Sequence, residues 1–182
     1  DPRRDILLAG DFNSAYEQSV LIPDFYPNAV NHILGSQGDE RKVADGKAPL
    51  YNLWFDLPAE QRYSDMFRGY WGTLMQNMVT PGLYDHRGVQ IVRKSFAVIR
   101  IPGLTAHDNG VGTPNRWTFF GGGQGMSDHF PLLVRFRVVP EGEQSDAIME
   151  LPNPGLQSTA GRERLPVAYD RVRVGALPTA DA

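Results

Sequence analysis

The sequence contains no cysteine, which excludes disulfide bonds and thiolate metal sites. No apolar run approaches the length of a membrane span. A basic excess is also missing, because 18 Lys and Arg stand against 21 Asp and Glu, for a net charge of −3. Non-specific nucleic-acid binding normally depends on a positive surface, so tight DNA binding without a metal ion is not expected.

What remains is the composition of an ordinary globular domain, with 182 residues, 41% of them hydrophobic and 21% charged. The composition changes at Pro140, where prolines, glycines and acidic residues become frequent. We therefore expect a domain over residues 1–139 and a Pro/Gly-rich tail over 140–182. Within the tail, 167–174 alternates between apolar and polar residues and could add one edge strand.

The first candidate site follows a short apolar run. Residues 6–9 (Ile-Leu-Leu-Ala) have the pattern of a buried strand, which ends at Gly10. Asp11 and Asn13 come next, and residues two apart in an extended segment point the same way. The pattern predicts that the carboxylate and the carboxamide share one pocket.

The second candidate site lies far downstream. Ser127-Asp128-His129 follows a glycine-rich loop at 121–125 and precedes an expected strand at 131–139. Carboxylates hold hard divalent cations, an amide donates to developing negative charge, and an imidazole binds or protonates oxygen. Two acids, an amide and an imidazole at strand ends thus suit metal-assisted phosphoryl transfer. Each motif alone could instead be an ordinary strand exit or a chance match.

Together and in this order, residues 10–13 (Gly-Asp-Phe-Asn) and 127–132 (Ser-Asp-His-Phe-Pro-Leu) resemble the endonuclease/exonuclease/phosphatase family. Deoxyribonuclease I, abasic-site endonucleases, neutral sphingomyelinases and inositol polyphosphate 5-phosphatases belong to it. The segments 50–54, 71–74 and 95–96 resemble its bacterial, often exported, nuclease-like branch. The resemblance covers residues 6 to about 139 and implies a secreted or periplasmic protein.

The resemblance implies in-line attack of water on a phosphate ester, most naturally a phosphodiester. Asp11 would orient or deprotonate the water, Asn13 would donate to the phosphoryl oxygens, and His129 would be the general base or a phosphate-binding group. The implied cofactor is Mg²⁺, with Mn²⁺ or Ca²⁺ as alternatives, held by Asp11, Asn13 and Asp128. The substrate could be DNA, RNA, a phospholipid or a small phosphate ester.

The resemblance also implies an α/β layered sandwich. The motifs belong to the second half of a four-layer deoxyribonuclease I-like fold, with a mixed sheet and short helices. The first half of that domain normally supplies a metal-binding glutamate, so the chain looks like its C-terminal half. The expected partners are a phosphate-ester substrate, including nucleic acid, and either the missing half or a second copy. Either would cover an apolar sheet face that includes Leu7, Val98, Leu133 and Phe136.

One position departs from the family pattern. Relatives carry an aspartate directly after the position of Leu74, and that carboxylate orients the catalytic histidine, whereas this chain has Met75. Asp85 could replace it only if its loop folds back. The departure motivates an alternative in which the chain is a degenerate, non-catalytic half-domain. If Met75 does remove the acid, Met75→Asp should increase hydrolysis in protein that retains the first half of the domain.

Local patterns complete the prediction. Aromatic segments carry Arg62, Tyr63 and Trp71, which are candidate substrate contacts, although packing residues would look the same. We expect six or seven strands and two or three short helices, with Ser14 capping a helix through Val20. The expected elements are helices within 14–20 and 28–34, a loop over 35–49, and strands over 50–57, 74–80, 89–101 and 131–139.

Overall fold

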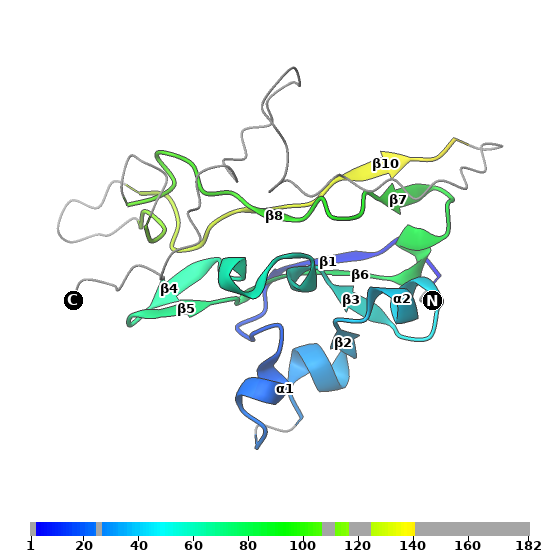
Figure 1. The fold of residues 1–182 in the computed structure, drawn as a ribbon, viewed down its shortest axis with the longest axis horizontal. Helices are drawn as coiled ribbons and strands as arrows, with labels where there is room; N and C mark the ends of the chain where they lie inside the picture. The colour runs from blue at the N-terminus through cyan, green and yellow to red at the C-terminus, as the bar shows by residue number, and fades with distance from the viewer. Residues whose placement is uncertain (1–2, 25–26, 107–111, 117–124, 141–182) are drawn as a thin grey trace.

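A mixed four-stranded sheet is the centre of the computed structural model, which describes residues 3–24, 27–106, 112–116 and 125–140 (Figure 1). Its order is β1-β6-β3-β2. β1 pairs antiparallel with β6, β6 antiparallel with β3, and β3 parallel with β2. The strands are β1 (Leu7–Asp11), β6 (Met75–Val79), β3 (Leu50–Asn52) and β2 (Ser36–Gln37). The predicted α/β class with a mixed sheet is therefore present.

Within the described residues, three two-stranded pairs accompany this sheet. β4 pairs with β5, β7 with β10, and β8 with β9, all antiparallel. In Figure 1, β7, β8 and β10 run along one side of the sheet, and the β4–β5 hairpin lies at one end. The bounds are β4 (Asp65–Phe67), β5 (Tyr70–Gly72), β7 (Val89–Ile91), β8 (Ala97–Val98), β9 (Leu132–Leu133) and β10 (Phe136–Val138).

The prediction of continuous strands over 89–101 and 131–139 is wrong, because both segments are interrupted where they lie opposite one another. Lys94 has a positive φ of 58°, which turns the chain out of the extended conformation. On the other strand, the Arg135 backbone N–H donates to Ser95 Oγ at 3.0 Å. This side-chain acceptor takes the place of a regular ladder bond between the two segments.

The helices are short. They are α1 (Gln18–Leu21), a π-helical turn η1 (Ala29–Ile33), α2 (Glu40–Ala44), and the 3₁₀ turns η2 (Leu53–Asp56), η3 (Ala59–Gln61) and η4 (Pro81–Tyr84). The predicted capping role of Ser14 is wrong, since α1 has Glu17 at its N-cap without a side-chain hydrogen bond. The predicted loop at 35–49 instead holds β2 and α2, and Asp39 caps α2. The strand expected at 50–57 ends early, because Asn52 caps η2.

Alternation along the central strands divides the core between two faces of the sheet. Tyr51 and Val79 point to one face, where they join a large cluster with Trp54, Phe96 and Phe130. The opposite face packs a smaller cluster, which consists of Val30, Leu50 and Met78 with Leu8, Phe12 and Leu34 against it. The site described below therefore rests on a sheet that is packed on both sides.

Two expectations about apolar surfaces are corrected. The run at residues 6–9 is not fully buried, because β1 is an edge strand and Leu7 is 39% exposed. The expected uncovered face is not formed by the four residues proposed for it: Val98 is buried at 3% exposure, and Leu133 and Phe136 are half-buried. Of these four, only Leu7 is exposed.

No helix in the described ranges is long and apolar enough to cross a membrane. The tail beyond Pro140, with the strand expected at 167–174, lies outside the described residues.

Candidate active site

The first motif forms a tight turn at the end of β1. The backbone ladder continues one residue past the strand, since the Phe12 N–H donates to the Leu74 carbonyl at 3.0 Å. Asn13 then adopts a positive φ of 48°, and its N–H donates to Asp11 Oδ1 at 2.8 Å. Asparagine tolerates this left-handed conformation better than most residues, and aspartate commonly accepts such a bond two residues on. The turn fixes Asp11 and Asn13 beside one another at the sheet edge.

A buried polar network supports the backbone on either side of this turn. The Gln76 side-chain amide donates to the carbonyls of Ser14, at 2.7 Å, and Thr73, at 2.5 Å. Gln76 in turn accepts from Asn52 Nδ2 at 2.8 Å. Both amide side chains are fully buried. Because every donor here is matched to an acceptor, the network fixes the backbone just after Asn13.

The second motif is fastened to the β4 strand. The His129 N–H donates to Ser127 Oγ at 3.1 Å, and the Phe130 N–H donates to the Ser64 carbonyl at 2.6 Å. An isolated antiparallel bridge pairs Asp65 with His129. Phe130 is 1% exposed and belongs to the main core cluster. The histidine backbone is therefore held between a turn and a buried aromatic anchor.

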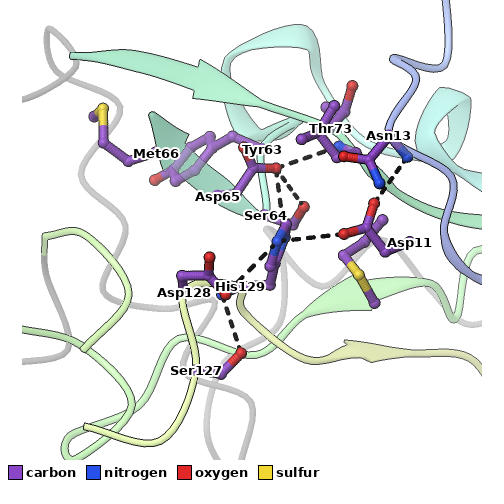
Figure 2. Close-up of polar contacts among 12 residues, drawn as sticks. Asp11, Asn13, Tyr63, Ser64, Asp65, Met66, Thr73, Ser127, Asp128 and His129 are labelled. Carbon is purple, nitrogen blue, oxygen red and sulfur yellow. Dashed lines mark hydrogen bonds and ion pairs between the residues drawn. The ribbon is translucent and has the colours of Figure 1, made fainter. Parts of the chain in front are cut away.

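The two motifs meet at the His129 ring, which Figure 2 shows between three carboxylates. Nε2 lies 3.6 Å from Asp11 Oδ2 and 3.8 Å from Asp128 Oδ1. The Asp11 and Asp128 side chains are 39% and 64% exposed, whereas that of His129 is 18% exposed. The structure thus brings together residues that are 117 positions apart in the chain, as the two motifs predict.

Asp65 is the third carboxylate, and sequence reasoning missed it. Its Oδ2 lies 3.7 Å from His129 Nδ1, and its side chain is 6% exposed. The same oxygen accepts from Ser64 Oγ at 3.1 Å and from the Leu74 N–H at 3.2 Å. Nδ1 is buried and makes no hydrogen bond within the described residues. A shift of under about 1 Å would complete one, and such bonds are often long before substrate is bound.

Glycine at position 72 gives the Asp65 carboxylate its space. Gly72 is the cross-strand partner of Asp65 in the β4–β5 hairpin. A Cβ at position 72 would lie 2.9 Å from Asp65 Cγ and 3.0 Å from Oδ2, and closer still to Oδ1. Real Cβ atoms essentially never approach other atoms this closely, so a side chain at 72 would push the carboxylate away. An acid that pairs with a glycine across a hairpin is therefore the sequence signal that could have identified Asp65.

The structure also shows which acid lies beside the His129 ring, where the resemblance leads us to expect an aspartate at position 75. Met75 is the cross-strand partner of Asp11. The Asp65 carboxylate reaches the backbone of Leu74, the residue directly before it. Asp85 instead accepts from the Arg87 N–H in its own turn. The acid beside the imidazole thus comes from β4 and not from β6 or from the loop at 85.

The three predicted substrate contacts also make packing contacts within the protein, and their role toward a substrate stays a prediction. Arg62 Nε donates to the Leu57 carbonyl at 2.8 Å, and its Nη1 donates to the Tyr16 hydroxyl at 3.0 Å. The Tyr63 and Trp71 rings pack with their centroids 4.3 Å apart. All three side chains are half-buried.

The donor set at the site suits a hard divalent cation in its chemistry. Asp11 and Asp128 present partly or largely exposed carboxylates to one another across Nε2, and Mg²⁺ prefers oxygen ligands with several waters retained. Asn13 lies beside Asp11 in Figure 2 and adds an amide oxygen. Within the described ranges, no group of three or more His, Cys, Asp or Glu side chains is already gathered as a metal site. Two carboxylates with an amide match the sparse protein ligation that Mg²⁺ tolerates.

Comparison of the chain with protein-family models, with curated proteins and with solved structures finds no match. The site is therefore the basis for the function proposed below.

Proposed function

We propose that this protein hydrolyses phosphate esters, phosphodiesters in particular, by in-line attack of water, as a member of the deoxyribonuclease I-like endonuclease/exonuclease/phosphatase family. The observation that carries the proposal is the His129 ring, which lies between the buried Asp65 and the exposed Asp11 and Asp128. A buried acid behind an imidazole and exposed acids in front of it suit proton transfer at a charged substrate.

The histidine would act through Nε2. A proton on Nδ1, directed at Asp65, leaves the Nε2 lone pair free on the exposed side of the ring. Nε2 would take a proton from the attacking water while the new P–O bond forms and the ester P–O bond breaks. The leaving oxygen would receive its proton from solvent. Asp65 would stabilise the imidazolium that results.

The exposed polar groups would position the substrate. Asp11 lies on the same side of the ring as Asp128 and would orient the water. Asn13, held rigidly by the turn, would donate its amide to a phosphoryl oxygen. Asp11, Asn13 and Asp128 are the residues that would hold Mg²⁺ or Mn²⁺. When bound, the ion neutralises charge that builds on the phosphoryl oxygens.

Asp65 weakens the case for a degenerate domain. That alternative was motivated by Met75, on the assumption that the histidine then lacks an acid partner. The imidazole has a buried carboxylate 3.7 Å from Nδ1, so Met75 does not leave it alone. A four-layer fold, with a second sheet supplied by other residues, is part of the same proposal.

The test is hydrolysis of a panel of phosphodiesters and phosphomonoesters with Mg²⁺, with Mn²⁺, and after chelation. The panel should include single- and double-stranded DNA, RNA, a phospholipid and a small chromogenic diester. We expect metal-dependent cleavage of at least one diester. Absence of cleavage of every substrate with either ion, by folded protein that includes the second sheet, would contradict the proposal and leave the non-catalytic alternative.

A further inference from the structure

Two large aromatic side chains stand in solvent at the tip of the β4–β5 hairpin. Phe67 is 61% exposed and Tyr70 is 80% exposed. They are directly opposite one another in the antiparallel register. Aromatic rings normally supply buried contact area, and a pair left in solvent at one spot indicates a binding surface.

The register places both rings on the same face of the hairpin as the acid behind His129. Asp65 and Phe67 are two residues apart in β4, so their side chains point the same way. Tyr70 and Gly72, their partners in β5, share that face. Met66 and Trp71 point to the opposite, packed face. The exposed rings thus begin about 6.6 Å along the strand from Asp65, two residues at the usual rise.

The turn between the rings is tight and carries a cation. Arg68 and Gly69 both have positive φ, 50° and 85°, as a two-residue hairpin turn of the primed type requires. Arginine is uncommon in this conformation. Its guanidinium lies 5.1 Å from the centre of the Phe67 ring. Aromatic faces beside a guanidinium are the usual means of stacking nucleobases next to a phosphate backbone.

We propose that the hairpin tip, defined as Phe67, Arg68 and Tyr70, stacks against a base adjoining the reacting phosphate, and that the substrate is a single-stranded nucleic acid. The location of the phosphate rests on the proposed function. A paired base cannot offer both faces to side chains without leaving its stack, which favours single strands. A lipid surface is the weaker fit, because the rings share their face with a site carboxylate and flank a charged side chain.

The test is binding of a fluorescent single-stranded oligonucleotide, measured by anisotropy with Mg²⁺ in a His129→Ala background that does not cleave. An oligonucleotide of the same length without bases is the matched ligand. Phe67→Ser and Tyr70→Ser should each weaken binding of the normal oligonucleotide by about 5- to 150-fold. Binding of the abasic ligand should already be weak and should not change. Phe67→Trp and Tyr70→Phe should restore binding, which excludes a folding defect.

Val20→Ser on α1 is the matched surface control, since Val20 is 70% exposed and distant in sequence from the hairpin. Equal affinity for normal and abasic ligands, or no effect of the two serine variants, would overturn the proposal. Binding of the same variants to phosphatidylcholine vesicles is measured in parallel. Serine variants that weaken binding to the vesicles and not to the oligonucleotide would also overturn the proposal. Base-dependent binding without any hydrolysis by the wild-type protein would support the hairpin tip and count against the proposed function alone.

Discussion

Replacing Asp65 with asparagine keeps the shape of the side chain and removes its charge. The two bonds that Oδ2 accepts, from Ser64 Oγ and from the Leu74 N–H, can persist to the amide oxygen. Each loses about 1 kcal/mol when the acceptor becomes neutral, while the cost of burying a charge is relieved. We therefore expect a folded protein, with the effect confined to the His129 ring.

The expected effect on catalysis is large. Without the carboxylate 3.7 Å from Nδ1, the imidazolium formed during water attack loses its stabilising charge and the ring loses its fixed tautomer. General acid–base assistance is typically worth about 10²–10⁴-fold, or about 3–5 kcal/mol of barrier. Asp65→Asn should lower kcat by about this factor, with little change in KM, in a steady-state assay on the best substrate of the panel.

Two further variants make this prediction specific. Gly72→Ala should reproduce most of the loss, because the new methyl group occupies the space of the Asp65 carboxylate. Asp85→Asn, the same change at an exposed turn, should leave kcat unchanged. Wild-type kcat in folded Asp65→Asn protein, together with a large loss in a His129 variant, would refute the role given to Asp65.

Three other expectations concern neighbouring positions. Met75→Asp should give no gain in hydrolysis, because Asp65 already supplies the acid beside His129 and a carboxylate at position 75 would face Asp11 across the strands. A gain of tenfold or more in kcat would show that Asp65 does not assist the histidine. Gln76→Ala should lower the free energy of unfolding by about 3 kcal/mol or more in urea denaturation, since it leaves several buried polar groups unpaired; a loss under about 1 kcal/mol would contradict the network. Burial raises the pKa of the Asp56 carboxyl above 3.8, although Lys94 and a hydrogen bond from Tyr51 oppose the shift. The contribution of the protonated carboxyl to stability is therefore present below pH 3.8 and is lost as the pH rises through the raised pKa. The unfolding free energy of wild type relative to Asp56→Asn should fall over that pH range, and parallel pH curves for the two proteins would contradict the assignment.

The convergence of the two motifs was predictable because it depends on strand ends. Asp11 follows an apolar run, and His129 precedes another, so sequence patterns place both at element boundaries. The chemistry that the resemblance implies requires the two motifs to converge, and His129 Nε2 lies 3.6 Å from Asp11 Oδ2. The strand expected at 74–80 depends on the same kind of local pattern and forms β6.

Other parts depend on tertiary contacts that no local pattern carries. Asp65 was missed because its role requires the hairpin pairing with Gly72, which brings its carboxylate to a histidine 64 residues away. The sequence offers Tyr63 and Trp71 as candidate substrate contacts without showing that their rings pack against each other, because a sequence cannot distinguish an exposed ring from a packed one. The long strand expected at 89–101 failed because one residue, Lys94, turns the chain with a positive φ.

The most direct test of the central claim is kcat for His129→Gln on the phosphodiester that wild type cleaves best. His86→Gln is the matched control, because His86 lies in a surface turn and contacts Gln90. The account predicts a loss of about 10²-fold or more for His129→Gln and wild-type kcat for His86→Gln, with both proteins folded. Equal kcat for His129→Gln and wild type would contradict it.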